Sequence, residues 1–115
     1  MDICITATSD NLDSMMDERF GRCKYFIFVD PATLQFRAVQ NTAVNDSGGA
    51  GIAAATMVLK STPAAIITGI IGGNAMEVLK AASARVFTCK NTTVREAIGM
   101  YNAGKLERID APNNK

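Results

Sequence analysis

Residues 24–30, Lys-Tyr-Phe-Ile-Phe-Val-Asp, are the stretch of this chain that decides its fold. The run over 25–29 is entirely aromatic or β-branched, which predicts a strand that is buried on both faces near the centre of a sheet. Residues 30–33, Asp-Pro-Ala-Thr, have the composition of a turn. Alternating side chains over 35–40 then predict the antiparallel return of a hairpin.

The segments around this hairpin are predicted from their hydrophobic spacing and their capping residues. A strand is expected over 2–8, before the hairpin. Capping-box patterns pair Asn74 with Glu77 and Thr93 with Glu96, each at the start of a predicted helix. The elements expected after the hairpin are helices over 51–60, 74–82 and 93–104, with strands over 64–68 and 85–89. We expect the tail from about Asp110 to be frayed.

The element order βββαβαβα predicts one α/β domain over residues 1–115. Strand–helix–strand connections form right-handed parallel crossovers, and the early hairpin adds one antiparallel strand. The sequence therefore predicts a mixed five-stranded sheet between helices.

Composition narrows the possible functions. A chain of 115 residues with 48% hydrophobic residues can bury one core, and its net charge of +1 gives no general attraction for nucleic acid or an anionic membrane. No apolar run approaches the roughly 20 residues that a membrane-spanning helix needs. Three cysteines without a close pair and the lack of a basic leader predict a reducing, cytoplasmic setting. Histidine is absent, which excludes histidine-based triads and histidine-ligated zinc, so we expect no enzymatic activity.

Two glycine-rich loops are candidate binding elements. Ser47-Gly48-Gly49-Ala50-Gly51 leads into a predicted helix, and Gly69-Ile70-Ile71-Gly72-Gly73-Asn74 joins a buried strand to the next helix. Backbone N–H groups at helix N-termini bind anions, and ligands of open α/β sheets collect at the carboxyl ends of the strands. The same sequences also suit tight strand-to-helix junctions, so both interpretations stay open.

A third candidate is Arg19-Phe20-Gly21-Arg22-Cys23-Lys24, where three cations surround a thiol. Neighbouring cations lower the pKa of a thiol, and the thiolate binds soft metals. The alternative is a solvated basic turn in which Cys23 packs as a small apolar side chain. Cys4 and Cys89 lie in predicted strands, and we expect both in the core.

Four motifs stand in a recognisable order: the basic motif extended to Phe26, the first glycine loop with Ile52, the second with its flanks (68–75), and Thr-Thr-Val-Arg-Glu-Ala over 92–97. The chain from Ile3 to about Leu106 thereby closely resembles the dinitrogenase iron–molybdenum cofactor-binding family, the small carriers and accessory domains of nitrogenase cofactor assembly. The resemblance implies a ribonuclease H-like three-layer fold without hydrolase activity. It also implies non-covalent binding of an anionic metal–sulfur cluster, of Fe–Mo–S or another Mo–S type, by a carrier, store or scaffold.

The resemblance also implies the site residues. Many family members carry a histidine where this chain has Arg19, so Cys23 is the candidate metal ligand in its place. The residues expected to bind the cluster are Arg19, Phe20, Gly21, Arg22, Cys23, Ser47, Gly48, Gly49, Ala50, Gly51, Gly69, Ile71, Gly72 and Asn74.

The expected partners are proteins that donate and accept the cluster, and the expected oligomeric state is a monomer or a weak homodimer. We expect that the purified protein can lack the cluster. The alternative function is a small regulatory or interaction module that binds a phosphorylated metabolite or a partner protein.

Overall fold

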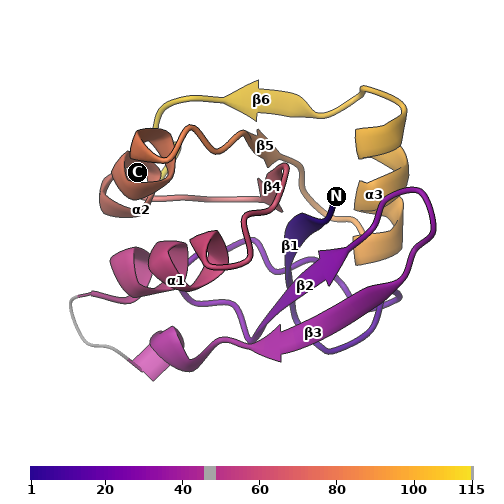
Figure 1. Ribbon diagram of the computed structural model, residues 1–115, viewed down its shortest axis with the longest axis horizontal. Coiled ribbons are helices and arrows are strands. Elements are labelled where there is room, and N and C mark those ends of the chain that lie inside the picture. The colour runs from indigo at the N-terminus through magenta and orange to yellow at the C-terminus, as the bar shows by residue number, and fades with distance from the viewer. Residues whose placement is uncertain (46–48, 115) are drawn as a thin grey trace.

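The computed structural model describes residues 1–45 and 49–114, in which one mixed sheet of six strands is packed against three α-helices (Figure 1). A short 3-10 helix, η1, covers Thr42–Asn45. The strands are β1 (Ile3–Ala7), β2 (Tyr25–Val29), β3 (Phe36–Gln40), β4 (Ile66–Thr68), β5 (Val86–Thr88) and β6 (Glu107–Ile109). The helices are α1 (Ala50–Leu59), α2 (Gly73–Ala81) and α3 (Val94–Asn102).

The strand order is β3-β2-β1-β4-β5-β6. The strands β1, β4 and β5 run parallel to one another, as the predicted crossovers require. Antiparallel pairs join β1 to β2, β2 to β3 and β5 to β6. The expected sheet of five strands with one antiparallel strand was therefore wrong. Strand β6 is a sixth strand, and both β2 and β6 run antiparallel to β1, β4 and β5. The ribonuclease H-like label stays a prediction.

The sheet separates two cores, and β2 explains how. Phe26 and Phe28 face the cluster beneath α1 and α2, whereas Ile27 and Val29 face the cluster beneath α3. All four side chains are buried, which confirms the strand predicted from its apolar run. Figure 1 shows α1 and α2 on one side of the sheet and α3 on the other.

Helix α3 begins as its sequence predicts. The Thr93 hydroxyl accepts a hydrogen bond from the Glu96 N–H at 3.1 Å, and the Glu96 carboxylate accepts one from the Thr93 N–H at 2.8 Å. The helix ends before Gly104, whose φ of 70° suits glycine. The predicted capping box and glycine stop are both confirmed.

The C-terminal tail is bound to the domain, which contradicts the frayed tail expected from residue 110. The segment after β6 turns towards α2 (Figure 1), where Asn113 hydrogen-bonds the backbone of Gly69 and Ile71. Among the helices of residues 1–45 and 49–114, none is long and apolar enough to cross a lipid bilayer.

Candidate functional site: a pocket at two helix N-termini

A pocket of about 410 Å³ lies where α1 and α2 begin, beside the loop that joins β1 to β2. This volume is in the range of small-molecule sites. Four separate parts of the chain form its wall. The described residues that line it are Phe20, Gly21, Arg22, Gly49, Ala50, Gly51, Ile52, Gly72, Gly73, Asn74, Ala75 and Asn114.

Both helices present their backbone to the pocket. The N-cap residues are Gly49 for α1 and Gly72 for α2, and glycine has no side chain with which to bond the N–H groups of the first turn. These N–H groups lack partners within their own helix and carry the positive end of the helix dipole. Two such ends at one pocket favour an anion.

The start of α2 corrects one prediction. Asn74 was expected as the N-cap, with Glu77 completing a capping box. The extended backbone at Gly72 (φ −85°, ψ 172°) instead makes that glycine the cap, so the helix begins at Gly73. Asn74 consequently lies in the first turn, where it lines the pocket.

Small residues bring three walls of the pocket together. A Cβ atom on Gly21 would lie 3.1 Å from both the N and the Cα of Gly51, and a Cβ on Gly51 would lie 3.4 Å from the Ala75 Cβ. The loop after β1 therefore rests on the backbone of α1, which rests in turn on α2. The pocket depends on this stack, because a larger side chain would push its walls apart.

The turn after β4 supports the pocket without lining it. A Cβ on Gly69 would lie 2.9 Å from the Cα, Cβ and O of Glu18, so the two backbones touch directly. The Phe20 N–H donates to the Ile70 carbonyl at 3.0 Å, and the Ile70 N–H donates to the Glu18 carbonyl. Gly69 and Ile70 therefore hold the Phe20 loop in place. Gly69 and Ile71 were both predicted to bind the cluster, but Ile71 is instead buried in the same core cluster as Phe20.

Asn41 fixes the turn that carries Arg22, and sequence reasoning missed it. Its buried side-chain amide donates to the carbonyls of Cys23, at 2.9 Å, and Gly21, at 3.3 Å. Its Oδ1 accepts from the Ala43 N–H at 3.0 Å. The only signal was an asparagine at the start of a polar loop.

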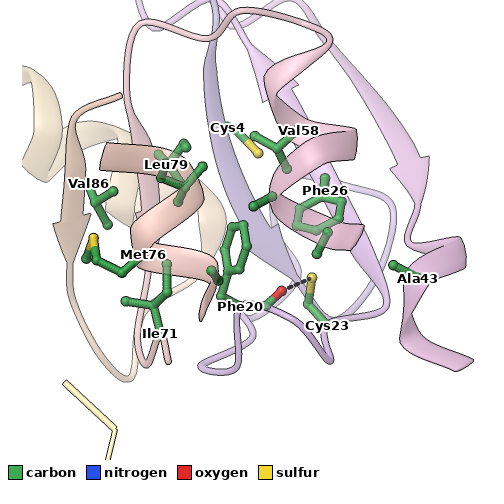
Figure 2. Packing of buried hydrophobic residues seen from close by; sticks show 14 of the residues in the cluster. Cys4, Phe20, Cys23, Phe26, Ala43, Val58, Ile71, Met76, Leu79 and Val86 are labelled. Carbon is green, nitrogen blue, oxygen red and sulfur yellow. Dashed lines mark hydrogen bonds between the residues drawn. The ribbon is translucent and has the colours of Figure 1, made fainter. Parts of the chain in front are cut away.

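Cys23 points into the core (Figure 2), and it is not among the described residues that line the pocket. Its side chain is fully buried, and its thiol donates to the Phe20 carbonyl at 3.4 Å. Burial, together with the nearby Asp17 carboxylate, raises the pKa of the Cys23 thiol to about 12. The predicted lowering of this pKa by cations was therefore wrong, and a metal-ligand role does not fit the geometry.

Of the three cations in this motif, Arg22 is the one that lines the pocket. Arg19 lies 3.5 Å from the Asp17 carboxylate and donates to the Arg22 carbonyl at 3.5 Å. Lys24 is exposed and is not among the described lining residues. The described lining residues include Arg22 and the first turns of two helices, and they include no carboxylate, so this part of the lining favours an anion.

The structure thus sorts the predicted site residues into three groups. Those that line the pocket are Phe20, Gly21, Arg22, Gly49, Ala50, Gly51, Gly72 and Asn74. Those placed elsewhere are Arg19, Cys23, Gly69 and Ile71, while Ser47 and Gly48 lie outside the described residues. Gly73, which also lines the pocket, lies within the predicted second glycine loop. The other lining residues were not predicted: Ile52 and Ala75 neighbour predicted residues, whereas nothing local marked Asn114.

Comparison with known proteins decides the family. The sequence model described as "Dinitrogenase iron-molybdenum cofactor" matches residues 1–104. This chain belongs to that family. The resemblance predicted from the four motifs is confirmed, and it points to a small protein related to molybdenum cofactors.

Three known proteins are similar to this chain over most of their length. The apo form of the orange protein from Desulfovibrio gigas is 36% identical, with a TM-score of 0.94 over 98% of this chain and 96% of that chain. A Thermotoga protein of the DUF35 family is 31% identical, with a TM-score of 0.85 over 99% and 97%. An uncharacterized Methanocaldococcus jannaschii protein is 29% identical over 85% of this chain and 86% of its own length.

Proposed function

We propose that this protein binds an anionic metal–sulfur cluster, of Fe–Mo–S or another Mo–S type, non-covalently in the pocket at the start of α1 and α2. It acts as a carrier, store or scaffold and performs no catalysis. One observation carries the proposal: two glycine-capped helix N-termini and Arg22 meet in a pocket whose described lining contains no carboxylate.

The walls favour a large, soft anion over a phosphate group. Phe20, Ala50, Ile52 and Ala75 place apolar atoms around the N–H donors, in a space of about 410 Å³. A metal–sulfur cluster spreads its negative charge over many weakly hydrated sulfur atoms, and hydrogen bonds to those sulfurs tune its properties. Such an anion can contact apolar groups and N–H donors together, whereas a compact phosphate prefers an entirely polar cradle.

Binding in this proposal uses hydrogen bonds and charge, without a protein–metal bond. Cys23 is buried with its proton retained, so it packs beneath the site. Non-covalent binding suits a carrier, because the cargo must pass from a donor protein to an acceptor. The orange protein, which shares 36% of its residues with this chain, was solved in its apo form. We accordingly expect this protein to be isolated with its pocket empty.

Anaerobic titration with tetrathiomolybdate, alone and with iron or copper, tests the proposal. The visible spectrum and the metal retained after desalting are measured. Stoichiometric retention with a new sulfur-to-metal charge-transfer band is the expected result. Complete loss of metal on desalting, together with calorimetric binding of pyrophosphate, would instead favour a module that binds phosphorylated metabolites.

A further inference from the structure

Within the described part of the C-terminal tail, Asn113 hydrogen-bonds the turn that joins β4 to α2. The Asn113 Oδ1 accepts from the Ile71 N–H at 2.8 Å, and its Nδ2 donates to the Gly69 carbonyl at 2.8 Å. The Asn113 backbone N–H also donates to the Ile71 carbonyl at 3.2 Å. Both ends of one carboxamide are thus used on the backbone of one turn, which requires asparagine's pairing of a donor with an acceptor.

The residues on either side of Asn113 lie against the first turn of α2. A Cβ on Gly72 would lie 3.3 Å from the Asn114 Nδ2, and a Cβ on Gly73 would lie 4.0 Å from the Pro112 ring. Asn114 also lines the pocket. The tail therefore supplies a pocket wall from a part of the chain that lies beyond residue 104, where the family match ends.

We propose that residues 111–114 form a C-terminal strap that completes the binding site, with Asn114 contacting the bound anion and Asn113 positioning Asn114. The inference rests on the proposed function. The Asn114 carboxamide adds two N–H donors to those of the helix ends and brings no negative charge. Gly72 leaves room for this carboxamide, since any side chain there would meet it.

The strap also differs from the other walls in how it is held. Residues 111–114 are exposed, and the hydrogen bonds described for them are those of Asn113, whereas the helices rest on a buried core. Segments with few buried apolar contacts open more readily than the core. The strap is consequently the wall that opens first when the anion enters or leaves.

A double-mutant cycle with tetrathiomolybdate as the probe tests the strap. Asn114→Ala and Asn113→Ala should each raise the Kd roughly ten- to hundredfold, as expected for losing hydrogen bonding to a charged ligand. The double variant should bind no more weakly than Asn113→Ala, because Asn113 acts through Asn114. Amide exchange of the Ile71 N–H should accelerate in Asn113→Ala and stay unchanged in Asn114→Ala.

Asn102→Ala is the matched control. Asn102 also donates its side-chain amide to a backbone carbonyl, that of Pro31 at 2.9 Å, but it lies at the end of α3 on the opposite face of the sheet. This variant should leave the Kd and the Ile71 exchange rate as in the wild type.

Each other outcome overturns a defined part of the reasoning. If the wild type retains tetrathiomolybdate and both strap variants bind it as tightly as the wild type does, the strap inference fails while the proposed function stands. Additive effects in the double variant would overturn the positioning role of Asn113. If the wild type retains none, the proposed function and the strap fail together.

Discussion

Replacement of Gly69 by alanine should destabilise the fold through one steric contact. The added Cβ would lie 2.9 Å from the Cα, Cβ and O of Glu18, whereas ordinary contacts begin at 3.4 Å. The two segments must therefore separate by roughly half an ångström, the difference between these distances. Because the neighbour is backbone, no rotamer change relieves the overlap. We expect a cost of about 3 kcal/mol, the upper end for overpacking.

The cost of Gly69→Ala can be measured by urea unfolding followed by circular dichroism, with thermal unfolding as a second measurement. For 115 residues, an unfolding entropy of about 2.1 cal/mol/K per residue makes each kcal/mol worth about 4 °C. The expected fall in Tm is therefore about 12 °C. The variant should also bind tetrathiomolybdate more weakly, because the displaced segment carries Phe20 to the pocket.

Gly99→Ala is the matched control for this prediction. Gly99 lies inside α3, and a Cβ there would meet nothing within 4 Å. Alanine should stabilise this position by about 0.5–1 kcal/mol, because glycine loses more conformational entropy in a helix. A Gly69→Ala variant as stable as the wild type, beside a stabilised Gly99→Ala, would refute the argument that backbone contact at Glu18 fixes the loop.

Three further predictions address charge, protonation and capping. Arg22→Glu should raise the Kd for tetrathiomolybdate at least about tenfold, because it reverses a charge at the pocket. Arg108→Glu, on the exposed edge strand β6, should leave the Kd as in the wild type. Equal Kd values for the two variants would contradict a role for Arg22 in binding. Because burial raises the pKa of the Cys23 thiol to about 12, against about 8.5 for an exposed thiol, the unfolded chain releases this proton first. The stability that the protonated thiol contributes is complete below about pH 8.5 and is lost as the pH rises towards 12. Between pH 8 and 10, the free energy of unfolding measured in urea should therefore fall by about 2 kcal/mol more in the wild type than in Cys23→Ala. Parallel pH profiles of the two proteins would disprove a contribution from the buried thiol. Thr93→Ala should lower the free energy of unfolding, measured by calorimetry, by about 1 kcal/mol, because the capping box is lost. Thr56→Ala, inside α1, should change stability little. A Thr93→Ala variant of wild-type stability would show that the cap contributes nothing.

The parts of the fold that the sequence predicts are those determined by neighbouring residues. The apolar run over 25–29 and the capping box from Thr93 to Glu96 carry their own signals, and both appear in the structure. Strand β6 carries no such signal, because Glu107 and Arg108 are exposed and the strand takes its hydrogen bonds from β5 at the sheet edge. Its existence depends on a partner that is distant in the sequence.

The candidate site shows the same division. Gly49–Gly51 and Phe20–Arg22 could be predicted because their motifs are contiguous. The environment of Cys23 could not, since its adjacent cations are exposed while its side chain enters the core near Asp17 and Asn41. Asn113 and Asn114 could not be assigned either, because their role depends on a distant turn: 42 positions separate Asn113 from Ile71, to which it is hydrogen-bonded.

The stack of Gly21 on Gly51 on Ala75 has a consequence for how this pocket can change over evolution. Its inner shape depends on a missing side chain at Gly21, where a Cβ would lie 3.1 Å from the Gly51 backbone, so adding one methyl group at Gly21 would push the loop after β1 away from α1. The lining residues Arg22, Ile52 and Asn114 form an exposed rim, and substitutions at exposed positions usually change stability little. Divergence in ligand preference should therefore accumulate at the rim, while the interior of the pocket stays the same.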